Sequence, residues 1–141
     1  MAGERLPILP CACANLRRAA RVVTRAYDAA LSKYSLKATQ FTVLQALEQL
    51  GPASQAELGE LLALDKTTLT RTLVPLAGAD WIQLGRGNDR REQRWSLTRS
   101  GRMILRRATD AWEESQASLR ARLGEGRWER LASDLAVVAA V

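Results

Sequence analysis

Residues 54–71 read SQAELGELLALDKTTLTR, a segment in which two short helices are expected to follow one another closely. Ser54 and Glu57 have the spacing of a capping box, in which the serine side chain accepts from the Glu57 amide and the glutamate reaches back to Ser54. Asp65 is a good N-cap for the second helix. We therefore predict a helix-turn-helix, although this spacing also fits a plain helical hairpin in a bundle.

The residues downstream favour the first interpretation. Residues 81–86 and 92–98 alternate apolar and polar side chains around a turn, Gly87-Asn-Asp-Arg-Arg91, which predicts a two-stranded hairpin with arginines at its tip. A hairpin directly after a helix-turn-helix makes a winged helix. In the helix after Asp65, the leucines at positions 69, 73 and 76 are expected to face the core.

Amphipathic helices are predicted on both sides of this unit, over residues 12–34, 38–50 and 99–123 and from Trp128 onward. The outer helices have apolar stripes but little core left to cover. We expect them to interlock with those of a second chain in a two-fold dimer, and packing onto the chain's own core is the alternative. The predicted fold class is mainly α with a small β-hairpin wing. We assign residues 1–11 to an N-terminal arm, 12–36 and 99–141 to a helical dimerisation region, and 37–98 to a winged helix-turn-helix domain.

The excess positive charge of the chain, +6 in total, lies within residues 66–107. This segment has ten basic and three acidic residues, whereas the rest of the chain has 11 basic and 12 acidic ones. A solvated basic face is one interpretation. The concentration of the positive charge in about a third of the chain, on a predicted helix and wing, instead favours a polyanionic partner. We predict that this partner is double-stranded DNA.

Several function classes lack the residues that they need. The chain has no histidine, and its only cysteines are Cys11 and Cys13, which excludes histidine-based acid–base chemistry, a Ser-His-Asp triad and the usual zinc sites. No glycine-rich phosphate-binding motif occurs. We therefore predict no enzyme, no cofactor and no metal site. The absence of an apolar run of about 20 residues and of a signal-peptide start leads us to expect a cytoplasmic protein without a membrane partner.

Over residues 12–135 the chain resembles the MarR family of transcriptional regulators. The order and spacing of the matching segments carry the resemblance, and these segments are Leu36…Gln40-Phe41-Thr-Val-Leu44, Ser54-Gln-Ala-Glu-Leu58, Leu64-Asp-Lys-Thr-Thr-Leu-Thr-Arg71, Leu76…Trp81-Ile82, Asp89-Arg-Arg91 and Leu97-Thr…Gly101. The resemblance implies a homodimer that binds a pseudo-palindromic operator and usually represses. Two departures are Lys37, where the family often has a capping Ser or Thr, and Pro75, which lies inside a predicted helix.

Hydroxyl and basic side chains on the outer face of the helix after Asp65 suit major-groove edges and phosphates. The predicted DNA-binding residues there are Lys66, Thr67, Thr68, Thr70 and Arg71. At the wing tip, Arg90 and Arg91 suit a narrow, electronegative minor groove. The resemblance implies that Arg91 reaches DNA while Asp89 supports the wing. Exposed polar surface without a partner is the alternative for each of these positions.

Cys11 and Cys13 stand at the start of the first predicted helix, where the helix dipole and nearby Arg17 and Arg18 would make a thiol more reactive. Cys13 aligns with the reactive cysteine of the family's organic-hydroperoxide sensors, and Tyr27 with a tyrosine that bonds that cysteine across the dimer. These three residues form a candidate redox sensor. Cysteines that only pack, with a small-molecule effector instead, are the alternative, and a soft metal ion held between subunits is a third.

A different class of function fits the same fold. A winged-helix dimer also serves as a protein-interaction or RNA-binding module that reads no operator. Salt dependence and a preference among duplex sequences separate this alternative from a DNA-binding regulator.

Overall fold

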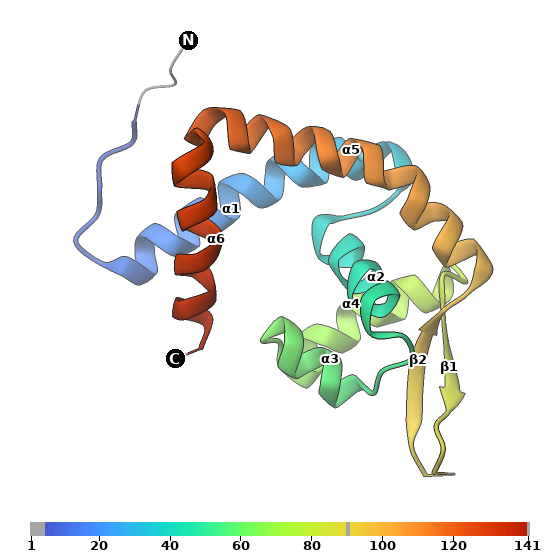
Figure 1. Ribbon diagram of the computed structural model, residues 1–141. Coiled ribbons are helices and arrows are strands. Elements are labelled where there is room, and N and C mark those ends of the chain that lie inside the picture. The colour runs from blue at the N-terminus through green and yellow to red at the C-terminus, as the bar shows by residue number, and fades with distance from the viewer. Residues whose placement is uncertain (1–4, 90, 141) are drawn as a thin grey trace.

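The computed structural model describes residues 5–89 and 91–140, which form six α-helices, a short 3-10 turn and one antiparallel hairpin (Figure 1). In chain order these elements are α1 (Ala12–Leu31), η1 (Ser32–Tyr34), α2 (Ala38–Leu50), α3 (Gln55–Leu62), α4 (Lys66–Gly78), β1 (Ile82–Arg86), β2 (Gln93–Leu97), α5 (Arg99–Leu123) and α6 (Glu125–Ala139). The predicted fold class, mainly helical with a two-stranded wing, is confirmed. Arg90 lies outside the described residues.

The helices and the hairpin form a winged-helix cluster with long helices above it (Figure 1). In the cluster, α2 packs against α4, α3 packs against α4, and the hairpin contacts α2, α3 and α4. Helices α1 and α5 lie side by side across the top. Helix α6 turns back from the end of α5 that is far from the hairpin and packs on α5, with no buried residue of its own.

The core lies between α2, α4 and the start of α5. Leu69, Leu73 and Leu76 of α4 are all buried, so the predicted inward face of this helix is confirmed. The Phe41 ring of α2 lies 5.9 Å, centroid to centroid, from the Trp112 ring of α5. This contact joins the helix-turn-helix core to the long helix above it.

Three side-chain caps fix where the helices of the winged-helix cluster begin. Ser54 Oγ accepts the Glu57 N–H at 3.1 Å, and Glu57 Oε2 accepts the Ser54 N–H at 2.7 Å, which confirms the capping box of α3. Asp65 Oδ1 accepts the Thr68 N–H at 2.8 Å and caps α4 as predicted. Thr98 Oγ1 accepts the Gly101 N–H at 2.9 Å and begins α5.

The end of α1 differs from the sequence prediction, and the cap of α2 was not predicted. The first helix was predicted to reach residue 34, but α1 ends at Leu31 and the last turn is 3-10, because Ser35 adopts a left-handed conformation with φ 57°. The N-terminus of α2 is capped without a Ser or Thr. Gln40 Oε1 accepts the Lys37 N–H at 2.9 Å, and Asp28 of α1 accepts the Ala38 N–H at 2.7 Å.

The hairpin is joined to the rest of the domain at the middle of β2 and at its base. Its pairs run from Ile82 opposite Leu97 to Arg86 opposite Gln93. Ala53, just before α3, adds a two-hydrogen-bond bridge to Trp95 of β2, with N···O distances of 2.9 and 2.8 Å. At the base of the hairpin, Gly101 lies so close to Trp81 that a Cβ atom at position 101 would come within 1.9 Å of the Trp81 carbonyl oxygen. Only glycine fits there without a shift of the backbone.

Candidate nucleic-acid interface

The first two turns of α4 present a polar surface on the side opposite the buried leucines. Lys66, Thr67, Thr68, Thr70 and Arg71 are all exposed, as the sequence predicted. Within residues 5–89 and 91–140, neither Lys66 nor Arg71 takes part in an ion pair. Both cations are therefore available to an external anion. Pro75 lies inside α4, which continues for three residues beyond it, to Gly78.

The turn between α3 and α4 places this surface. Ala63 adopts a left-handed conformation with φ 51°, and the Leu64 N–H donates to the Gly59 carbonyl at 2.9 Å. This pattern, with a left-handed residue after the helix and a hydrogen bond back across it, is a Schellman-type end. It reverses the chain within a few residues, so that α4 begins directly beside α3.

At the tip of the wing, Asp89 makes two contacts with the backbone of the turn. Its Oδ1 accepts the Arg91 N–H at 3.2 Å, while the Glu92 N–H donates to the Asp89 carbonyl at 3.0 Å. The Arg91 side chain is exposed. Asp89 thus shapes the turn from which Arg91 projects.

Arg94 connects the wing to α3, a contact that sequence reasoning missed. From β2 its guanidinium donates to the Pro52 carbonyl at 2.8 Å and to both carboxylate oxygens of Glu57, at 3.1 and 3.3 Å. It also donates to Glu92 at 2.9 Å. Such bidentate pairing fixes direction as well as distance. The wing is therefore held at a defined angle to the helix-turn-helix. In the sequence, Arg94 is one of the ten basic residues within 66–107, and its spacing does not indicate this contact.

The electrostatics of the two capping carboxylates follow from these contacts. The backbone hydrogen bond from Ser54 is the main cause that lowers the pKa of Glu57, with Arg94 contributing. The Thr68 backbone amide lowers the pKa of Asp65 in the same way. Both side chains stay ionised at neutral pH and cap their helices as anions.

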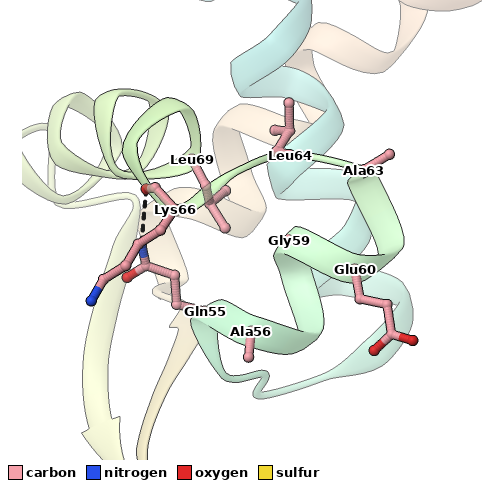
Figure 2. Close-up of a pocket in the computed structure, with 8 residues that line it drawn as sticks. All are labelled: Gln55, Ala56, Gly59, Glu60, Ala63, Leu64, Lys66 and Leu69. Atoms are coloured by element: carbon pink, nitrogen blue, oxygen red, sulfur yellow. Dashed lines mark hydrogen bonds between the residues drawn. The ribbon is translucent and has the colours of Figure 1, made fainter.

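A groove of about 700 Å³ lies between α3 and α4, and Figure 2 shows the side chains that line it. Leu64 and Leu69 contribute apolar side chains to its lining, and Glu60 and Lys66 contribute charged ones. At one end the Gln55 side chain crosses from α3 toward α4. Its Nε2 atom donates to Thr70 Oγ1 at 2.8 Å and lies 3.4 Å from the Lys66 carbonyl oxygen. No motif or spacing in the sequence indicates this bridge.

The candidate sensor residues are spread along α1. Cys11 is the N-cap of α1, and both cysteines are exposed. Cys13 and Tyr27 are separated by 14 helical positions, about 21 Å at 1.5 Å per residue, so one chain does not bring them together. The Tyr27 hydroxyl instead donates to Gln116 of α5 at 2.5 Å, and burial raises its pKa.

The N-terminal arm is fastened to the same end of α1. Asn15 pairs with Leu9 through two hydrogen bonds of 3.1 and 2.7 Å. The Arg18 guanidinium donates to the Pro7 carbonyl at 2.8 Å. The arm thus lies beside the cysteines, and Arg18 is engaged by the arm. Among the described residues, no helix is both long and apolar enough to cross a membrane.

Comparison with known proteins identifies the family. The MarR family model matches residues 36–92. The structure of the M. tuberculosis transcriptional regulator MosR in complex with DNA is 35% identical in sequence, with a TM-score of 0.82 over 92% of this chain and 94% of that one. The chain belongs to the MarR family. Because this is a family of transcriptional regulators, the prediction that the chain is not an enzyme is confirmed.

Other regulators are similar to the chain in structure or in sequence. The transcriptional repressor CouR, solved on a 23-mer DNA duplex, is 26% identical and superposes with a TM-score of 0.84 over 96% of this chain and 99% of its own. The HTH-type regulator YwoH of Bacillus subtilis (strain 168), whose function is uncharacterized, is 31% identical over 85 residues, which is 60% of this chain. The chain spans 62% and 66% of the length of the curated relatives that it matches.

Proposed function

We propose that this MarR-family chain binds double-stranded DNA as a homodimer, with the exposed face of α4 in the major groove and the wing beside it. The observation that carries the proposal is the exposed polar surface of Lys66, Thr67 and Arg71, held from behind by buried leucines. Rigid support of this kind is what a side chain that reads base edges needs. MosR and CouR, both solved in complex with DNA, support DNA as the partner of this chain.

Exposed apolar side chains on the outer helices support the homodimer. On α6, Leu135, Val137 and Val138 are 43%, 71% and 48% exposed, and α1 adds exposed Leu16 and Val22. Exposed apolar area costs roughly 25 cal/mol per Å² relative to burial. A second copy that covers these faces relieves that cost. A two-fold pair then presents two α4 helices to successive major grooves, about 34–36 Å apart, which calls for a pseudo-palindromic operator.

The regulator acts as a repressor, and an effector releases it. Two kinds of effector remain open. In the first, an oxidant modifies Cys13 and alters the packing beneath α1, and the exposure of both cysteines supports this route. In the second, the cysteines only pack and a small molecule is the effector. Either would change the distance between the two α4 helices.

The test compares three variants on DNA. A duplex selected from a random pool by the full-length protein serves as the operator, with a scrambled duplex and RNA of the same sequence as competitors. Arg71→Ala should lose preference for the selected duplex, by about 1–3 kcal/mol for each base contact. Arg91→Ala should weaken binding to both duplexes. Arg127→Ala, an exposed arginine on α6 with the same change of charge, is the matched control.

Two outcomes would contradict the proposal. One is that Arg71→Ala and Arg91→Ala bind the selected duplex as tightly as Arg127→Ala does. The other is that the RNA competes as well as the duplex, which would favour the RNA-binding alternative.

A further inference from the structure

The threonines of α4 differ in whether their hydroxyl protons already form hydrogen bonds within the protein. Thr68 Oγ1 donates to Asp65 Oδ2 at 2.7 Å, and Thr70 Oγ1 donates to the Lys66 carbonyl at 2.8 Å. A hydroxyl group has one proton. Neither side chain can donate a hydrogen bond to a base while these contacts hold. In the described part of the chain, no such contact holds the hydroxyl of Thr67.

Thr70 is held on a second side as well. Gln55, the first residue of α3, donates from Nε2 to Thr70 Oγ1 at 2.8 Å, so the oxygen also serves as an acceptor. Figure 2 shows the Gln55 side chain reaching across to the start of α4. Thr70 itself is exposed. With its oxygen facing two protein partners, the methyl group is the part of this side chain left for an external contact.

Gln55 selects the orientation of that methyl group. In a helix, threonine divides between two χ1 rotamers, because its hydroxyl can bond a backbone carbonyl one turn earlier from either one. The contact with the Lys66 carbonyl alone therefore does not fix the side chain. A donor that approaches from α3 matches only the rotamer that turns Oγ1 toward it. The bridge from Gln55 thus determines which way the methyl group points.

We propose that Gln55 is a positioning residue that turns Thr70 into a methyl reader, whose Cγ2 group contacts the C5-methyl group of a thymine in the major groove. The inference rests on the proposed DNA-binding function and deepens it. Thymine is the base that presents a methyl group in this groove, and threonine methyl groups are suitable partners for it. Thr67 and Arg71 then supply the polar contacts of the same helix.

The experiment removes only the methyl group from the DNA. In the selected duplex, each thymine is replaced in turn by deoxyuridine, and affinity is measured by fluorescence anisotropy. For the wild type, one thymine in each half-site should be sensitive, with a loss of about four-fold for the methyl group removed. Thr70→Val keeps a methyl group and should keep this sensitivity. Thr70→Ser keeps the hydroxyl, loses the methyl group, and should bind thymine and uracil duplexes equally.

Gln55→Leu tests the positioning role. This variant keeps a side chain of similar bulk but cannot form the hydrogen bond to Thr70. The thymine-to-uracil ratio should therefore fall toward one, while the melting temperature and the affinity for scrambled DNA stay near those of the wild type. The inference is overturned if Thr70→Ser keeps the wild-type sensitivity, if Thr70→Val loses it, or if Gln55→Leu leaves the ratio unchanged. These results leave DNA binding itself intact. Failure of the wild type to select any duplex would instead overturn the proposed function, and this inference with it.

Discussion

Replacing Gly101 by alanine tests the packing that joins the wing to α5. A Cβ atom at this position would come within 1.9 Å of the Trp81 carbonyl oxygen and 2.8 Å of its carbon. Carbon–oxygen contacts in proteins are about 3.3 Å or longer, so the backbones must separate by more than 1 Å. The Trp81 carbonyl cannot give way easily, since it accepts the Thr98 N–H at 3.1 Å while the Trp81 N–H donates to the Leu76 carbonyl at 3.0 Å.

The expected loss of stability is large for a single methyl group. Overpacking usually costs about 1–3 kcal/mol. We take the upper end because the added Cβ atom would collide with backbone atoms of Trp81 and not with a side chain that could rotate away. With an unfolding entropy of about 2.1 cal/mol/K per residue, a chain of 141 residues loses about 10 °C of melting temperature. Thermal unfolding followed by circular dichroism, at equal protein concentration, measures this directly.

Gly78→Ala is the matched control for this experiment. Gly78 ends α4, and a Cβ atom there has no neighbour within 4 Å. Alanine has the higher helix propensity, so this variant should melt at or slightly above the wild-type temperature. A backbone collision should lower the melting temperature of Gly101→Ala by about 10 °C relative to Gly78→Ala. A difference within about 2 °C would contradict the close contact between α5 and Trp81.

Three further changes test other parts of the account. Ala63→Gly removes a left-handed alanine with φ 51° and should stabilise the protein by up to about 1 kcal/mol in urea unfolding, whereas a loss would mean that the turn between α3 and α4 is not strained. The pKa values of Glu57 and Asp65 lie below their ordinary values of 4.5 and 3.8, so both stabilise the fold above about pH 4.5, and this contribution is lost as pH falls through the lowered values. Asp65→Asn keeps a cap that does not titrate, so its free energy of unfolding should fall less in acid than that of the wild type. A pH profile of stability identical to that of the wild type would refute the role assigned to Asp65. Hydroperoxide should convert the Cys13 thiolate to a sulfenate, with the peroxide reduced to an alcohol, and weaken DNA binding until dithiothreitol is added; an identical response of Cys13→Ser in a gel shift would eliminate the redox route.

The parts of the fold that were predictable are those whose causes are local in sequence. The capping box at Ser54 and Glu57 and the cap at Asp65 each join residues three apart, so their spacing alone gave the starts of α3 and α4. The alternation around Gly87 gave both strands to within one residue at most of their ends. Hydrophobic periodicity gave the inward face of α4.

The contacts that position the candidate interface were not predictable in the same way. Arg94 lies 37 residues from Glu57, and Gln55 lies 15 residues from Thr70. Nothing in the spacing of these residues indicates that they meet, because their contact depends on how α3 packs against β2 and α4. The polar residues of α4 could be named from sequence, but which of their hydroxyl groups remained free could not. Arg90 lies outside the described residues, so its place in the wing stays a prediction.

The salt dependence of duplex binding tests the central claim most directly. If each protomer of the dimer brings at least three cations to phosphates, six contacts form. The affinity should then fall about a thousand-fold between 50 and 200 mM salt. Titration of a labelled, selected duplex with the full-length protein at several salt concentrations measures the slope. A steep linear fall of log affinity with log salt is the predicted result, and an affinity that stays flat across this range would contradict binding of DNA through α4 and the wing.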